Sequence, residues 1–124
     1  MDLSLKGMRA LVCGSSQGIG KEIAIELANE GVEVLLIARN EEKLNSVLNE
    51  LSKKNNQNHS YIVADFENES DLTNKIEKFT SDNKIKIDIL INNSGGPPPG
   101  KITDAKISDF EKYMKMHLHC SHLL

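Results

Sequence analysis

The sequence predicts an α/β fold in which a doubly wound parallel sheet is covered by helices on both faces. Short apolar runs alternate with amphipathic segments along the chain, in the order β-α-β-α-β-α-β-α. The apolar runs are nearly continuous, as expected for strands that are buried on both faces. Strands joined in this way are parallel and need right-handed crossovers.

The first unit is a strand at residues 8–13 followed by a helix. Gly7 and Gly14 bound the apolar run of the strand. Gly31 ends the helix, as a glycine after the last helical turn often does. The apolar residues that recur at helical spacing between them are Ile19, Ile23, Leu27 and Ala28.

The second unit begins with an apolar strand at residues 32–38, which only Glu33 interrupts. Asn40 is a typical helix cap, and Glu41 and Glu42 follow in the first turn, where the helix dipole favours acids. The apolar stripe expected on this helix consists of Leu44, Val47, Leu48 and Leu51.

Two further strands follow a polar loop at residues 53–58. Residues 61–64 are predicted to form the third strand and residues 87–91 the fourth. The apolar residues of the helix between them are Leu72, Ile76 and Phe79.

A stiff loop and a last helix complete the pattern. The segment from Gly95 to Gly100 contains three prolines, which neither a helix nor a central strand tolerates. Ser108 with Glu111 three residues later indicates a capping box that opens the last helix. This helix is expected to run to the end of the chain through Phe110, Tyr113, Met114 and Leu118.

Size and composition limit the classes of protein that need to be considered. The 124 residues have room for one domain, with 39% hydrophobic and 27% charged residues, as in a soluble globular protein. A net charge of -3 argues against general nucleic-acid binding. No segment predicts a membrane span or a signal peptide, and Cys13 and Cys120 form no disulfide framework. A cytoplasmic protein without nucleic-acid or membrane partners is expected.

A glycine-rich turn lies between the first strand and the first helix. Its sequence is Gly14-Ser15-Ser16-Gln17-Gly18-Ile19-Gly20. Glycines here allow a sharp turn, a close approach of backbone N–H groups to a pyrophosphate, and tight packing of the helix on the sheet. The helix N-terminus adds unpaired N–H groups and a positive dipole end. The turn predicts dinucleotide binding; the alternative is a tight strand-to-helix turn without a ligand. A mononucleotide P-loop is excluded, because no Gly-Lys-Ser/Thr ending is present.

The spacing Gly-x-x-x-Gly-x-Gly resembles that of the short-chain dehydrogenase/reductase family, in particular the 3-oxoacyl-carrier-protein reductases. Cys13 departs from this pattern, since the family has threonine at that position. Two further motifs carry the resemblance. Asp65 with Phe66 matches the adenine-contacting aspartate, and Asn92-Asn93-Ser94-Gly95 is similar to the Asn-Asn-Ala-Gly element that lines the ribose. The resemblance implies a Rossmann-like sheet with strand order 3-2-1-4.

The end of the second strand indicates which dinucleotide binds. A carboxylate about twenty residues after the glycine turn would bind the ribose 2′-hydroxyl of NAD, whereas an arginine would pair with the 2′-phosphate of NADP. Ala38 stands where relatives that prefer NAD carry aspartate, and Arg39 and Asn40 follow. Arginine donates two charge-assisted bonds to phosphate. We therefore expect the cofactor to be NADP. The alternative is that Arg39 pairs with Glu41 or Glu42 at the surface. Gln17 gives no support for NADP, because many NADP-using relatives have Arg or Lys at that position.

The predicted cofactor site brings these segments together at the carboxyl ends of the strands. It comprises Gly14, Ser15, Ser16, Gln17, Gly18, Ile19, Gly20, Arg39, Asn40, Asp65, Phe66, Asn93, Ser94 and Gly95.

The family resemblance also implies a chemistry that these residues do not contain. Hydride passes between nicotinamide and a carbonyl or alcohol, with a serine, a tyrosine and a lysine four residues after the tyrosine. Four residues after Tyr61 is Asp65, and four after Tyr113 is His117. We therefore expect no catalytic residue here. Residues 1–124 are predicted to be an incomplete NADP-binding domain, with the catalytic half beyond Leu124.

The resemblance leaves two functions open. The intact protein would be an NADP-dependent reductase of a small carbonyl compound or an acyl thioester, and this chain alone would be inactive. The alternative is a non-catalytic NADP-binding or assembly module. His117 stands at the position of a family asparagine in the proton relay and is assigned no role.

Two remaining features are interpreted without a ligand. On a helix His119 and His122 share a face but His117 and His119 do not, so no metal site is predicted from these residues and Cys120. The strand at residues 87–91 would leave an apolar sheet edge exposed, which promotes pairing between chains. A homo-oligomer is therefore expected.

Overall fold

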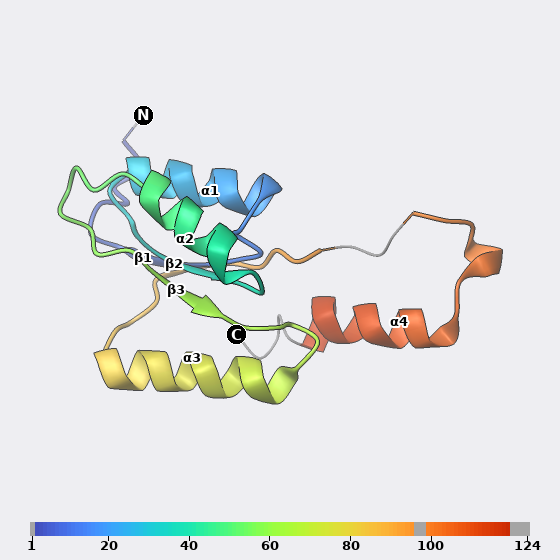
Figure 1. Cartoon of the computed structure of the whole chain (residues 1–124). Coiled ribbons are helices and arrows are strands. Elements are labelled where there is room, and N and C mark those ends of the chain that lie inside the picture. The colour runs from blue at the N-terminus through green and yellow to red at the C-terminus, as the bar shows by residue number, and fades with distance from the viewer. Residues whose placement is uncertain (1, 96–98, 120–124) are drawn as a thin grey trace.

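The computed structural model describes residues 2–95 and 99–119, which form a parallel sheet between two layers of helices. The strands are β1 (Arg9–Cys13), β2 (Glu33–Ala38), β3 (Ser60–Val63) and β4 (Ile89–Ile91). They are hydrogen-bonded in the order β3-β2-β1-β4, which confirms the predicted topology (Figure 1).

The central strands β1 and β2 are apolar because helices cover both of their faces. Val12 of β1 lies opposite Leu36 of β2 on one side and Ile91 of β4 on the other. Val12 and Leu36 are both fully buried. Continuous burial explains why these strands have nearly continuous apolar sequences.

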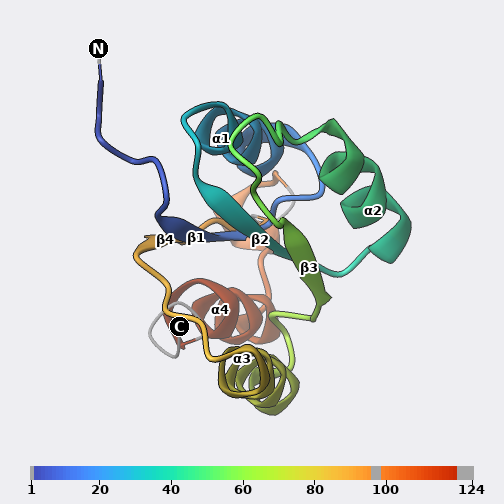
Figure 2. The same cartoon turned by 90° about the vertical axis from the view of Figure 1, so that its left-hand side faces the viewer.

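Helices lie on both sides of the sheet (Figure 2). The helices α1 (Gly18–Asn29) and α2 (Glu41–Glu50) cover one face, and α3 (Glu69–Asn83) and α4 (Ile107–Met114) lie on the other. The core under α1 and α2 is built from Ala10, Val12, Ala24, Ala28, Val32, Val34, Leu36, Ala38, Leu44, Val47 and Leu51. The core on the opposite face is built from Leu11, Cys13, Leu35, Ile37, Ile62, Ala64, Phe66, Leu72 and Met116.

Asparagine caps open α2 and α3. The Oδ1 atom of Asn40 accepts from the backbone N–H of Lys43 at 2.9 Å, which confirms the predicted cap. The Oδ1 atom of Asn68 accepts in the same way from the backbone N–H of Asp71 at 3.0 Å, a cap that was not predicted from the sequence. Both helices also carry acids in the first turn, where the dipole favours them.

The predicted start of the last helix is wrong. The helix α4 begins at Ile107 after Lys106, so Ser108 lies inside the first turn instead of capping it. The reason is that Asp109, rather than Glu111, faces the open end and accepts from the backbone N–H of Lys106 at 3.4 Å. A π-helical turn, Lys115–His119, then follows. Residues 96–98 of the predicted loop and residues 120–124 of the predicted helix lie outside the described residues.

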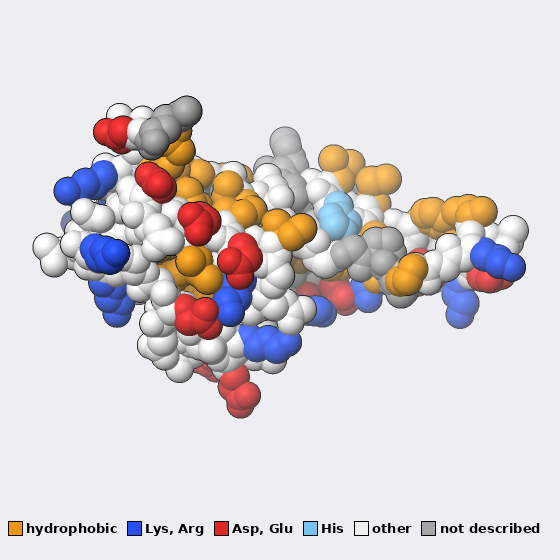
Figure 3. Space-filling model, turned by 90° about the horizontal axis from the view of Figure 1, so that it is seen from above, with side chains coloured by type: hydrophobic (Ala, Val, Ile, Leu, Met, Phe, Trp, Pro, Cys, Tyr) orange, Lys and Arg blue, Asp and Glu red, His pale blue; other side chains and the backbone are white. Residues whose placement is uncertain are grey.

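The segment carrying α4 projects from the body of the molecule (Figure 1). Hydrophobic side chains gather along it (Figure 3), and Ile107 is 78% and Phe110 54% exposed. At the sheet, the described residues include no strand beyond β4, whose Leu90 is 38% exposed. None of the described helices combines the length and apolar character needed to cross a bilayer.

Candidate nucleotide-binding site

Steric contacts explain two of the glycines in the turn between β1 and α1. A Cβ atom on Gly14 would lie 2.7 Å from the carbonyl oxygen of Asn93, and one on Gly20 would lie 2.2 Å from the carbonyl oxygen of Gly14. Both approaches are to backbone, which cannot move cheaply. The glycines therefore let β1, α1 and the end of β4 meet closely.

Gly18 is required for a different reason. Its φ of +60° is left-handed, a conformation that glycine adopts without strain. An added Cβ there would meet nothing within 4 Å. The backbone at Gly18 thus borders open space, as a backbone that receives a bulky ligand must.

Two side chains hold this turn in place. The buried hydroxyl of Ser15 accepts from the N–H of Ile37 in β2 at 3.1 Å. The Nδ2 atom of Asn93 donates to the carbonyl oxygen of Gly14 at 3.4 Å. The turn is therefore fixed from both neighbouring strands.

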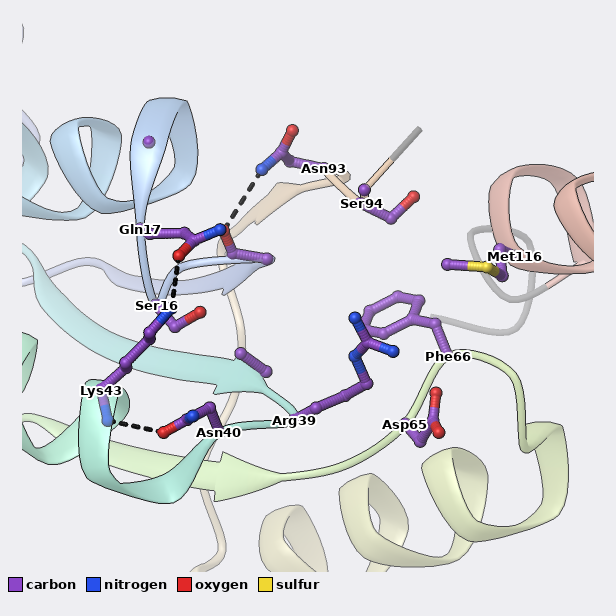
Figure 4. A pocket seen from close by; sticks show the side chains of 14 residues that line it. Ser16, Gln17, Arg39, Asn40, Lys43, Asp65, Phe66, Asn93, Ser94 and Met116 are labelled. Carbon is purple, nitrogen blue, oxygen red and sulfur yellow. Dashed lines mark hydrogen bonds between the residues drawn. The ribbon is translucent and has the colours of Figure 1, made fainter. Parts of the chain in front are cut away.

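The turn forms one wall of a hollow of about 630 Å³ at the carboxyl ends of the strands (Figure 4). This volume lies within the range of small-molecule and cofactor sites. The hollow is lined by Gly14, Ser16, Gln17, Gly18, Ala38, Arg39, Asn40, Lys43, Asp65, Phe66, Asn93, Ser94, Gly95 and Met116.

Most of the predicted site residues meet at this hollow, but three do not line it. Ser15 is buried within the turn, and Gly20 packs against Gly14. Ile19 is 74% exposed on the first turn of α1. Ala38, Lys43 and Met116 also line the hollow, although they were not among the predicted site residues.

The N-terminus of α1 differs from those of α2 and α3. Gln17 occupies the cap position of α1 without a side-chain hydrogen bond to the helix, and the first turn contains no acid. Its first N–H groups therefore lack the capping partners that Asn40 and Asn68 provide in the other two helices. Such an end binds anions through its N–H groups and its dipole.

Arg39 lies at the opposite side of the hollow, at the end of β2. Its side chain is 68% exposed, and Nη1 lies 3.9 Å from Oε1 of Glu67. Glu67 accepts a closer contact from Lys112 of α4, at 3.0 Å. The salt bridge that the structure gives Arg39 is thus a long one to Glu67, and not the alternative pairing with Glu41 or Glu42.

The third and fourth strands contribute the remaining wall. Asp65 follows β3 and its Oδ1 accepts from the N–H of Glu67 at 2.9 Å, while Phe66 is buried beside it. After β4, the hydroxyl of Ser94 lies 3.0 Å from Nδ1 of His117. This contact links the edge of the hollow to the π-helical turn after α4.

Cys13 is not a reactive group of this site. Burial raises the pKa of its thiol to about 12, although a hydrogen bond from the backbone of Asn93 acts in the opposite direction. The described residues contain no cluster of three His, Cys, Asp or Glu side chains that would hold a metal ion. Cys120 and His122 of the C-terminal group lie outside the described residues.

The sequence matches a family model over almost its whole length. Residues 8–122 match the model of the short chain dehydrogenase family. Glucose 1-dehydrogenase of Gluconobacter oxydans is 34% identical over 116 residues, which cover 90% of this chain and 42% of that protein. For 3-ketodihydrosphingosine reductase of Mus musculus, the identity is 32% over 118 residues, or 93% of this chain and 36% of that protein. The chain therefore spans less than half the length of these curated relatives.

Solved structures show the same fold with a bound cofactor. L-sorbose reductase from Gluconobacter frateurii, complexed with NADPH and L-sorbose, superposes with a TM-score of 0.88 at 27% identity. The match covers 100% of this chain and 47% of that one. A short chain dehydrogenase from Burkholderia cenocepacia in complex with NADP gives a TM-score of 0.84 at 27% identity, over 96% of this chain and 48% of that one. With its sheet order, its glycine turn and these matches, the chain belongs to the short-chain dehydrogenase/reductase family.

Proposed function

We propose that this chain forms the NADP-binding half of an oxidoreductase that transfers hydride between nicotinamide and a carbonyl or alcohol substrate. The observation that supports this most is the hollow between the uncapped N-terminus of α1 and the guanidinium of Arg39. NADP has an anionic group for each end, the pyrophosphate and the 2′-phosphate.

The pyrophosphate would lie against the turn. Gly18 leaves space beside its backbone, and the N–H groups at the start of α1 would donate to the phosphate oxygens. Ser16 lines the same part of the hollow and brings a hydroxyl donor. The lack of a capping side chain and of a first-turn acid leaves this end without a competing anion.

The choice of NADP rests on the end of β2. Ala38 has no carboxylate to accept from a ribose 2′-hydroxyl, and Arg39 offers a fork of donors to a 2′-phosphate. Its link to Glu67 is long and solvent-exposed, so a phosphate would replace it at small cost. Asp65 and Phe66 would border the adenine, and Asn93, Ser94 and Gly95 the nicotinamide ribose, as the family resemblance implies.

The hydride-transfer step would need groups that these 124 residues do not supply. When bound, the cofactor would supply the hydride. A separate group must transfer the proton, and a tyrosine phenol with a pKa near ~10 needs a neighbouring cation to do so near neutral pH. Neither Tyr61 nor Tyr113 is followed by a lysine four residues later. We propose that this chain alone gives no turnover. In the intact enzyme the substrate would be a small carbonyl compound or an acyl thioester.

A second candidate function, which the lack of a Tyr-x-x-x-Lys pattern within residues 1–124 leaves open, is a non-catalytic NADP-binding or assembly module. Sequencing the gene and transcript downstream of codon 124 separates the two. A continuing reading frame with Ser and Tyr-x-x-x-Lys supports the reductase, and a stop codon directly after Leu124 supports the module.

Thermal unfolding tests NADP binding, which the reductase and the NADP-binding module have in common. A ligand at 100 times its dissociation constant stabilises the folded chain by about 2.7 kcal/mol. We expect NADPH to raise the melting temperature more than NADH does. Nicotinamide mononucleotide, which lacks the adenosine and its 2′-phosphate, is the control and should have little effect. No shift with any dinucleotide would contradict the proposal.

A further inference from the structure

We infer that Lys43 is a second phosphate-binding cation, which Gln17 holds in position and which acts with Arg39 to select a 2′-phosphorylated nucleotide. This inference rests on the proposed NADP site and adds a residue to it. Lys43 lines the same hollow as Arg39, although it belongs to a helix and not to a strand end.

The position of Lys43 is electrostatically unusual. It lies in the first turn of α2, where the positive end of the helix dipole disfavours cations and where Glu41 and Glu42 are the favoured type. Within residues 2–95 and 99–119, Lys43 forms no salt bridge. Its side-chain partner is the neutral amide oxygen of Gln17, at 2.7 Å from Nζ. A cation held without a counter-ion at the rim of a hollow is suited to bind an anion.

The hydrogen bond to Gln17 orients the ammonium group but leaves it able to bind. An ammonium has three N–H donors, and Gln17 takes one of them. In Figure 4 the Lys43 side chain points toward Gln17 in the glycine turn, whereas Arg39 points toward Phe66. The two cations thus come from separate elements, and two N–H donors of Lys43 remain for a ligand.

Charge balance favours two cations over one. A phosphate monoester carries about -1.5 to -2 at pH 7. Arg39 supplies a single positive charge, which Glu67 partly offsets at 3.9 Å. Lys43, which forms no salt bridge in the described part of the chain, provides the second charge. NADH has a neutral 2′-hydroxyl in place of the phosphate, so the second cation would contribute little to its binding.

The test is calorimetric titration of the full chain and of Lys43→Met with NADPH and with NADH. We expect the substitution to weaken NADPH binding by about 5- to 20-fold and NADH binding by less than about 2-fold. Lys53→Met is the matched control, because Lys53 is also exposed but does not line the hollow. It should leave both affinities unchanged. Lys43→Arg, which keeps the charge, should retain most of the preference for NADPH.

A second measurement guards against an indirect effect on folding. The ³¹P resonance of the bound NADP⁺ 2′-phosphate reports its second pKa, which is about 6 for a free monoester. Two cations should lower this pKa, and Lys43→Met should move it back toward the free value. Unchanged NADPH affinity in Lys43→Met, or equal loss for NADPH and NADH, would overturn this inference alone. Failure of the unsubstituted chain to bind either dinucleotide would instead contradict the proposed function.

Discussion

Asn93, at the end of β4, donates a hydrogen bond from Nδ2 to the carbonyl oxygen of Gly14, 3.4 Å away. The same Nδ2 atom is 2.9 Å from the place where a Cβ on Gly20 would lie. One side chain thus closes the space between the glycine turn, the first helix and the fourth strand. The shape of the wall that the glycine turn forms around the hollow depends on this packing.

Gly20→Ala should destabilise the chain and abolish dinucleotide binding. The new Cβ would meet backbone at 2.2 Å, so α1 must move away from the turn. Overpacking of this kind costs about 1–3 kcal/mol. Urea unfolding measures the loss. Gly95→Ala is the control, since nothing lies within 4 Å of its added Cβ, and equal stability of the two variants would contradict the packing argument.

Arg39→Asp should reverse the cofactor preference. It removes the guanidinium and places a carboxylate near the ribose, where it would repel a 2′-phosphate and accept from a 2′-hydroxyl. We expect NADPH binding to weaken by about 30-fold or more and NADH binding to change little or to improve. Lys54→Asp makes the same charge change at an exposed loop position and should leave the affinities for NADPH and NADH unchanged. Equal losses for both dinucleotides in Arg39→Asp would refute the assignment.

Asn40→Ala should destabilise α2 through the loss of its cap. The carboxamide accepts from the N–H of Lys43 at 2.9 Å, and removing such a cap costs about 0.5–2 kcal/mol. Asn45→Ala, an exposed change inside the same helix, should be neutral or slightly stabilising because alanine has the higher helix propensity. Chemical denaturation of both variants checks this, and similar effects would argue against the cap.

The buried thiol of Cys13 should make stability fall at high pH. Its pKa is raised from 9.0 to about 12 in the folded chain, so the unfolded chain loses the proton first as pH rises above about 9. The contribution of the protonated thiol to the free energy of unfolding is therefore fully present below that pH and declines as the pH rises toward 12. The difference in urea stability between the native sequence and Cys13→Ala, measured from pH 7 to pH 11, isolates this contribution. A difference that is constant with pH would contradict the burial of the thiol.

The chain should self-associate in solution. The described residues leave the outer edge of β4 unpaired, and α4 exposes Ile107 and Phe110. Phe110→Lys should shift the distribution toward monomer in sedimentation velocity experiments. Ser81→Lys adds the same charge at an exposed position of α3 and should leave the distribution of monomer and oligomer unchanged. A native chain that is monomeric and unfolds cooperatively would contradict this prediction.

The sequence predicted the fold well because its signals are local and mutually consistent. The continuous apolar runs of β1 and β2 and the asparagine at position 40 each have one structural interpretation, and the structure agrees with them. The start of α4 was mispredicted because Ser108–Glu111 and Lys106–Asp109 both have capping-box spacing. Sequence spacing alone cannot decide which acid faces the open N-terminus.

The candidate site was less completely predictable. Gly14, Gly18 and Arg39 stand out because each belongs to a recognisable strand end or turn, and all line the hollow. Lys43 carries no such signal, because it belongs to no motif and a single lysine near the start of a helix does not by itself mark a binding site. Its contact with Gln17 joins positions 26 apart in the chain and emerges only when α1 and α2 pack side by side.

The most direct test of NADP binding by this chain is calorimetric titration with NADPH, with NADH as the comparison. A backbone cradle at α1 together with cations at Arg39 and Lys43 predicts saturable one-to-one binding of NADPH, with NADH at least about ten-fold weaker. A correctly folded chain that gives no binding heat with either dinucleotide, and whose melting neither of them changes, would contradict it.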